Sequence, residues 1–145
     1  MRRKFVTLDV FTSQRFAGNP LAVVLDSGGL DTAAMQTIAR EFNLSETVFV
    51  APPAEISSRA KIRIFTPASE LPFAGHPTVG TAVLCGRLDG GTNAREFVLE
   101  LGIGPVRCKV TPADAESGRG RDHRASSSGF CHAAPPSTTS KPHDR

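Results

Sequence analysis

The run Gly75-His76-Pro77 combines residue types that can bind an anion at the start of a helix. Proline fixes φ and lacks the N–H that the first helical turn leaves unpaired, so Pro77 suits the first helical position. A residue before proline is disfavoured in the α region, so His76 is predicted to be the N-cap. The backbone amides of Thr78 and Val79 would then point at a ligand carboxylate. His76 could bind that carboxylate, relay a proton or merely cap the helix, and its position alone does not separate these roles.

Glu46 is the second residue whose surroundings suggest chemistry. It begins a predicted strand and alternates with Val48 and Val50, so its side chain shares a face with apolar neighbours. A carboxyl held among apolar side chains is suited to general acid/base work. The same pattern is also typical of a solvated glutamate at a strand end.

The elements that must position these residues follow from hydrophobic periodicity and turn signals. Helices are predicted at 31–42 and 77–87, and the second is apolar nearly all round, as in a buried helix. Strands are predicted at 5–11, 21–25, 47–50, 60–65, 96–101 and 106–110. This order repeats a strand-strand-helix unit and adds a hairpin. It predicts an α+β fold in which a mixed sheet curves around a central buried helix.

The chain divides into two unlike parts at about residue 111. Every Val, Ile, Leu and Met lies within residues 1–111, which are long enough to form a small core. Residues 112–145 have none of these types and are rich in Ser, Ala, Gly, Pro, Arg and His. We therefore expect this tail to be disordered, since it has too little apolar surface to offset its conformational entropy.

Composition argues against several function classes. The net charge of +3 is small and evenly spread, which disfavours nucleic-acid binding. No apolar run is long enough for a membrane span or for a signal peptide. The three widely spaced cysteines fit neither a zinc motif nor a disulfide framework, so an intracellular, cytoplasmic protein without bound metal is expected. Tail residues Cys131 and His132 are adjacent but match no standard metal motif.

Three segments taken together resemble a known family. Phe16–Val23, Asn43–Val50 and Arg63–Gly80 are similar, in sequence and in order, to motifs of the PhzF-like family of phenazine biosynthesis. The resemblance covers about residues 4–111. Members of that family are cofactor-independent isomerases with the two-domain diaminopimelate-epimerase fold.

The resemblance implies roles for particular residues. Glu46 matches the family's acid/base carboxylate, which moves a proton between carbons of a dihydro-hydroxyanthranilate-type substrate. Gly75 and His76 match the substrate-binding loop, and Ser45, beside Glu46, would line the pocket. The amides of Thr78 and Val79 would help to hold the substrate carboxylate. Gly75 stands near where related epimerases carry a catalytic cysteine, which favours isomerase over racemase chemistry.

The resemblance extends only to the first of the family's two similar halves. The second half would supply a further catalytic aspartate and a second helix N-terminus. Our hypothesis is that residues 112–145 are an out-of-frame continuation of a longer gene. Three alternatives stay open for residues 1–111: an active isomerase, an inactive fragment or small-ligand-binding half domain, and a homodimer whose two halves imitate the full cleft.

Overall fold

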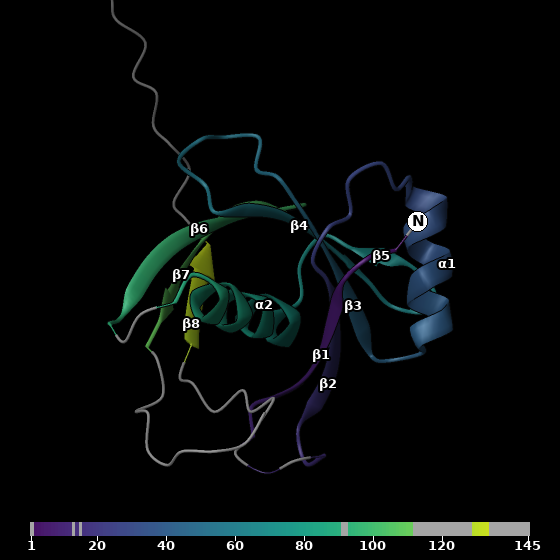
Figure 1. Cartoon of the computed structure of the whole chain (residues 1–145), viewed down its shortest axis with the longest axis horizontal. Helices are drawn as coiled ribbons and strands as arrows, with labels where there is room; N and C mark the ends of the chain where they lie inside the picture. Colours follow the sequence, from purple (N-terminus) through teal and green to yellow (C-terminus); the bar gives the residue numbers. More distant parts are fainter. Residues whose placement is uncertain (1, 13, 15, 91–92, 112–128, 134–145) are drawn as a thin grey trace, which may run out of the picture.

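The fold, seen in a computed structural model, is a mixed sheet with two helices (Figure 1). The structure describes residues 2–12, 14, 16–90 and 93–111, and the backbone of 129–133. In chain order the elements are β1 (Phe5–Val10), β2 (Asn19–Val24), α1 (Thr32–Phe42), β3 (Glu46–Ala51), β4 (Ala60–Phe65), β5 (Glu70–Leu71), α2 (Gly75–Leu88), β6 (Arg95–Leu101), β7 (Gly104–Val110) and β8 (Gly129–Ala133).

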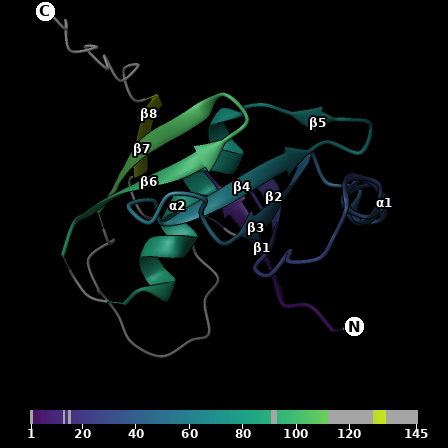
Figure 2. The same ribbon diagram turned by 90° about the horizontal axis from the view of Figure 1, so that it is seen from above.

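The sheet has the order β1-β2-β3-β4-β6-β7-β8, and β5 pairs with β4. The pairs β2–β3 and β4–β6 are parallel and the other pairs are antiparallel. Figures 1 and 2 show this sheet curving around α2, with α1 on the outer side near β3 and β4. The predicted α+β fold with a mixed sheet around a central buried helix is therefore confirmed.

Helix α2 packs closely against the inner face of the sheet. A Cβ at Gly80 would lie 2.7 Å from a methyl of Val10 and 2.8 Å from a methyl of Leu21. The absence of a side chain at Gly80 thus lets the helix backbone approach β1 and β2. The main core cluster, which includes Val83 and Leu99, fills the rest of this inner space.

Helix α1 has the limits that the sequence predicts. The Asp31 carboxylate accepts a hydrogen bond from the amide of Ala34 (2.8 Å), which caps the N-terminus. Asn43 ends the helix in the left-handed conformation, with φ of 51°. The buried face of the helix packs on Phe49 and Phe65, which form a second, smaller core cluster.

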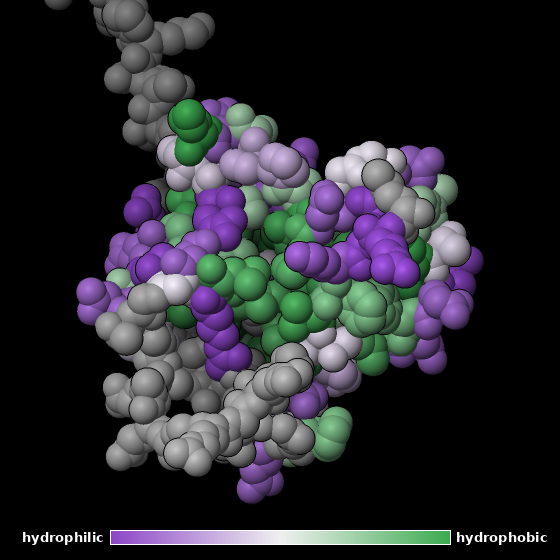
Figure 3. Space-filling view, viewed as in Figure 1, coloured by the Kyte–Doolittle hydropathy of each residue, from purple (hydrophilic) through white to green (hydrophobic). Residues whose placement is uncertain are grey.

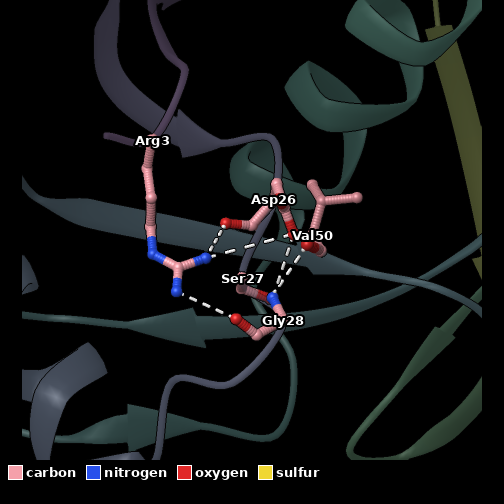
Figure 4. A network of polar contacts seen from close by, with 5 residues as sticks. All are labelled: Arg3, Asp26, Ser27, Gly28 and Val50. Atoms are coloured by element: carbon pink, nitrogen blue, oxygen red, sulfur yellow. Dashed lines mark hydrogen bonds and ion pairs between the residues drawn. The ribbon is translucent and has the colours of Figure 1, made fainter. Parts of the chain in front are cut away.

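The start of the chain is tied to the loop that follows β2 (Figure 4). The guanidinium of Arg3 donates to the carbonyls of Asp26 (2.7 Å) and Gly28 (2.9 Å). Ser27 donates from its amide (3.0 Å) and its hydroxyl (2.8 Å) to the carbonyl of Val50. These contacts anchor the connection between β2 and α1 to the carboxyl end of β3.

Several elements differ from the sequence prediction. Strands β2 and β7 begin at Asn19 and Gly104, each two residues earlier than expected, and the two-residue strand β5 was not predicted. The sequence predicts a disordered tail at 112–145, whereas the backbone of 129–133 pairs with β7 as β8. Strand pairing uses backbone groups, so an edge such as that of β7 can bind an extended segment without an apolar pattern. The rest of that tail lies outside the described residues.

Arg59 and Asp89 connect β4 to the end of α2. The guanidinium donates two hydrogen bonds to the Asp89 carboxylate, at 2.8 and 2.6 Å. These bonds lower the pKa of the Asp89 carboxyl below its usual value. The pair therefore contributes to stability only while Asp89 is ionised.

We expect Asp89→Asn to lower the free energy of unfolding by about 0.5–1 kcal/mol at pH 7, since the pair is partly exposed. Asp89 has a lower pKa when folded, so the unfolded chain binds more protons as the pH falls. Its contribution is present above the pKa of an unfolded aspartate, about 3.9, and is lost as the pH falls through the folded value. Urea unfolding of both proteins at pH 7 and near pH 3 measures this. If the free energies of unfolding of the two proteins differ by the same amount at both pH values, the prediction is wrong.

Candidate active site

The structure brings together the carboxylate of Glu46 and the imidazole of His76, which lie thirty residues apart in the sequence. Oε2 of Glu46 lies 2.9 Å from Nε2 of His76, and each side chain is only 16% exposed. Although the atoms are close, their alignment is not that of a hydrogen bond. Both are buried atoms without a hydrogen-bond partner among the described residues. The two groups attract when His76 is protonated, and both retain capacity to bind a ligand.

Glu46 owes its position to the start of β3. This strand runs parallel to β2, and Glu46 pairs in register with Leu21. Alternation along a strand puts Glu46 on the same face as Val48, which belongs to the cluster around α2. The carboxylate therefore faces the helix that carries His76, as the predicted alternation with Val48 and Val50 required.

The start of α2 lies earlier than predicted. The N-cap is Ala74 and the helix begins at Gly75, so the prediction of His76 as N-cap was wrong. Proline is tolerated throughout the first turn, where no N–H has an intrahelical partner, so Pro77 does not have to be the first helical residue. His76 therefore takes a helical position, from which its side chain reaches Glu46.

This earlier start changes which amides can face a ligand. The amide of Thr78 donates to the carbonyl of Ala74 (3.3 Å), and its hydroxyl donates to the same atom (2.7 Å). Thr78 is fully buried, and Val79, one residue further into the helix, is partly buried. Among the described residues, the helix-start amides without a backbone partner are those of Gly75 and His76. The amide of Thr78, by contrast, is already used within the helix start.

Gly75 and Ser45 lie on the exposed side of the site. No atom lies within 4 Å of the position that a Cβ of Gly75 would occupy, so a ligand can approach its backbone. Ser45 is exposed in the turn before β3 and has no hydrogen bond within the described part of the chain. It adjoins Glu46 along the chain, and the structure shows no contact between Ser45 and His76.

Two buried threonines near the site were not selected from the sequence. The hydroxyls of Thr47 and Thr81 are buried without a hydrogen-bond partner among the described residues, as are the facing atoms of Glu46 and His76. Buried polar groups without partners are uncommon and often mark functional regions. All four lie at the start of β3 or in the first half of α2. Burial of a hydroxyl depends on packing, so a local sequence pattern could not have identified them.

The described side chains form no group of three or more potential metal ligands. The tail residues Cys131 and His132 lie in β8, of which the structure describes only the backbone. Within the described residues, neither helix is long and apolar enough to cross a membrane.

Comparison with known proteins places these features in a family. The family described as phenazine biosynthesis-like protein matches residues 8–141. The chain belongs to this family. The resemblance of the three sequence segments is thereby confirmed.

Members of the phenazine biosynthesis-like family with similar sequences include named isomerases. An uncharacterised isomerase of Mesorhizobium japonicum is 62% identical over 112 residues, which are 77% of this chain and 37% of the relative. The trans-2,3-dihydro-3-hydroxyanthranilate isomerase of Pseudomonas aeruginosa is 46% identical over 103 residues, which are 71% of this chain and 36% of the relative. The chain thus spans little more than a third of the length of these relatives.

Solved structures agree with the fold. A predicted epimerase from Pseudomonas aeruginosa superposes with a TM-score of 0.72 and 40% identity, over 78% of this chain and 40% of that chain. A hydroxyproline epimerase from Agrobacterium vitis has a TM-score of 0.59 at 13% identity, over 77% of this chain and 38% of that one, and shows the fold alone. The expected half of an epimerase-like two-domain fold is confirmed.

Proposed function

We propose that this chain carries the acid/base side of a cofactor-independent isomerase that shifts a proton on a small carboxylated substrate. The observation that carries the proposal is the 2.9 Å approach of the Glu46 carboxylate to the His76 imidazole. The family and its named isomerases support the reaction class. The proposed substrate class is the dihydro-hydroxyanthranilate type, after the substrate named in that relative.

In the proposed reaction, Glu46 takes a proton from one carbon of the substrate and returns it to another. The C–H bond breaks as the O–H bond forms on Glu46, and the substrate double bonds shift before the proton is delivered. Proton and electron pair are conserved, so the step needs no oxidant or reductant. The poor solvation of both side chains suits such a transfer, because few waters compete for the proton.

The start of α2 would hold the substrate carboxylate. Within the part of the chain that the structure describes, the amides of Gly75 and His76 have no backbone partner, and the helix dipole favours a negative charge there. The open space beside Gly75 lets the carboxylate reach these amides. The substrate would then lie beside His76, within reach of Glu46, and Ser45 would line the outer side of the pocket.

Solvent proton exchange tests this proposal. The chain is incubated in deuterated water with trans-2,3-dihydro-3-hydroxyanthranilate, and deuterium incorporation is followed by mass spectrometry. Incorporation that requires Glu46 supports the isomerase. Folded protein that incorporates no deuterium above the rate without enzyme would contradict it.

His76→Asn is expected to lower kcat/KM for this exchange by about 10- to 100-fold. In the proposed complex the variant would lose the imidazole's hydrogen bond to the substrate carboxylate, and a hydrogen bond to a charged group is worth about 1.5–3 kcal/mol. Asparagine keeps a polar side chain, so the fold should persist. Initial exchange rates at several substrate concentrations provide the measurement, and His76→Asn kinetics equal to those of the unaltered chain would remove His76 from the site.

A half domain that binds a small carboxylate without turnover is the second candidate. The open space beside Gly75 and the start of α2 favour it, because they could hold a carboxylate whether or not turnover follows. Binding of the substrate without deuterium incorporation, in folded protein, would support this candidate.

A homodimer of two such halves is the third candidate. Figure 3 shows hydrophobic residues gathered on the face over α2 and β1, and apolar patches of this kind often mark contact surfaces. This candidate predicts a discrete dimer by light scattering at micromolar concentration. A monomer, or a broad distribution of aggregates, would count against it.

A further inference from the structure

Segment 70–74 leads the chain from β5 into α2 and therefore determines where Gly75 and His76 lie. Its last residue, Ala74, is the N-cap of α2 and accepts the amide hydrogen bond of Thr78. The segment has only two residues of strand pairing, Glu70 with Phe65 and Leu71 with Ile64. So short a pairing is weak support for a site that requires accurate geometry. Two further contacts come from other elements.

Arg63 of β4 forms the first of these contacts. Its Nε and Nη2 donate to the two carboxylate oxygens of Glu70, at 2.7 and 2.6 Å. Nη2 also donates to the hydroxyl of Thr32 at the start of α1 (2.9 Å). A two-bond arginine–carboxylate contact restricts orientation as well as distance. Glu70 is thus fixed against β4 and α1.

The turn between β6 and β7 forms the second contact. A Cβ at Gly102 would lie 2.9 Å from Cα and 3.2 Å from the carbonyl oxygen of Pro72. The amide of Ile103 donates to that same carbonyl (3.3 Å). The positive φ of this turn, 115°, occurs at Gly104, which has no atom within 4 Å of its Cβ position. Gly102 therefore leaves the space that Pro72 occupies, whereas Gly104 allows the positive φ of the turn.

A side chain at position 102 would displace Pro72 rather than the turn. The β6–β7 hairpin is held by seven residue pairs, with Leu99 and Leu101 buried in the core. The segment around Pro72 follows only two such pairs. The clashing atoms of Pro72 belong to the backbone, so no side-chain rotation relieves the contact. The displacement would pass along the chain to Gly75 and His76, three and four residues away.

We propose that segment 70–74 positions the Glu46–His76 pair, and that Gly102 and Arg63 are positioning residues for it. Gly102 acts through Pro72, and Arg63 acts through Glu70. Only the catalytic consequence of this proposal rests on the proposed function, because the placement of the pair is a property of the folded chain.

The variant Gly102→Ala tests the proposal, with Gly104→Ala as its matched control. Both add one methyl group to the same turn. Gly104→Ala strains the turn through its φ of 115° but meets no other residue, whereas only Gly102→Ala meets Pro72. In the ¹⁵N-labelled full chain, the amide resonances of Gly75 and His76 should therefore shift more in Gly102→Ala than in Gly104→Ala. If the isomerase is active, kcat/KM for solvent exchange should fall by up to about 10²-fold in Gly102→Ala and by less in Gly104→Ala, as expected for misplacement on the ångström scale.

A second pair of variants covers the case in which Gly102→Ala does not fold. Arg63→Lys removes the two-bond contact with Glu70, since lysine lacks the planar fork. Arg59→Lys is the control, because Arg59 makes an equivalent contact with Asp89 at the other end of α2. The Gly75 and His76 resonances should shift in Arg63→Lys more than in Arg59→Lys.

The outcomes are distinct. A folded Gly102→Ala variant whose Gly75 and His76 resonances match those of Gly104→Ala would overturn the proposal, whatever the activity. If Gly102→Ala is unfolded, equal shifts in Arg63→Lys and Arg59→Lys would overturn it. Absence of exchange by the unaltered chain would reject the proposed function but leave the resonance test decisive.

Discussion

Glu46→Gln is expected to abolish most solvent proton exchange, with a fall in kcat of about 10²–10⁴-fold. This is the range typical of removing a positioned general acid or base. Glutamine has the shape of glutamate, but its amide cannot accept and return a proton. The carboxylate lies 2.9 Å from His76 and is largely shielded from water, as suits a group that transfers a proton. Deuterium incorporation into the substrate measures the loss.

Glu41→Gln is the matched control for this experiment. Glu41 is an exposed carboxylate on α1, outside the site, and its replacement should leave the exchange rate unchanged. Circular dichroism of both variants should match that of the unaltered chain. Exchange by Glu46→Gln at the rate of Glu41→Gln would show that another group transfers the proton.

Phe65→Ala is expected to cause the largest loss of stability, about 3–5 kcal/mol. Phe65 is fully buried at the end of β4, and its ring meets that of Phe49 edge to face at 5.4 Å between centroids. Truncation removes this aromatic pair and leaves a cavity between the sheet and α1, which the surrounding residues fill only in part. Thermal unfolding should show a fall in Tm of roughly 10 °C or more.

Phe16→Ala provides the comparison, because it removes the same side chain from a position that is 91% exposed. Its effect should stay within about 0.5 kcal/mol, as for most surface substitutions. The two variants thus separate burial from residue type. If the free energies of unfolding of Phe65→Ala and Phe16→Ala differ by less than about 1 kcal/mol, the cluster beneath α1 does not contribute to stability as described.

Local features of the fold were predictable where a few neighbouring residues determine backbone conformation. Asp31 and Asn43 limit α1 because a short polar side chain caps one end and a left-handed residue closes the other. The face on which Glu46 lies followed from strict alternation along β3. The start of α2 was placed too late, since the preference of a residue before proline yields when tertiary packing favours helix.

Most of the kinds of element, the buried character of α2 and the two residues proposed for proton transfer could thus be inferred from the sequence. Tertiary packing alone brings Glu46 and His76 to 2.9 Å and starts α2 at Gly75 rather than at Pro77. Tertiary packing also pairs β8 with β7, and no apolar pattern in the sequence predicts this pairing. The physical reason is the same in each case. Periodicity and caps act over a few residues, whereas the distance between remote side chains depends on how every intervening element packs.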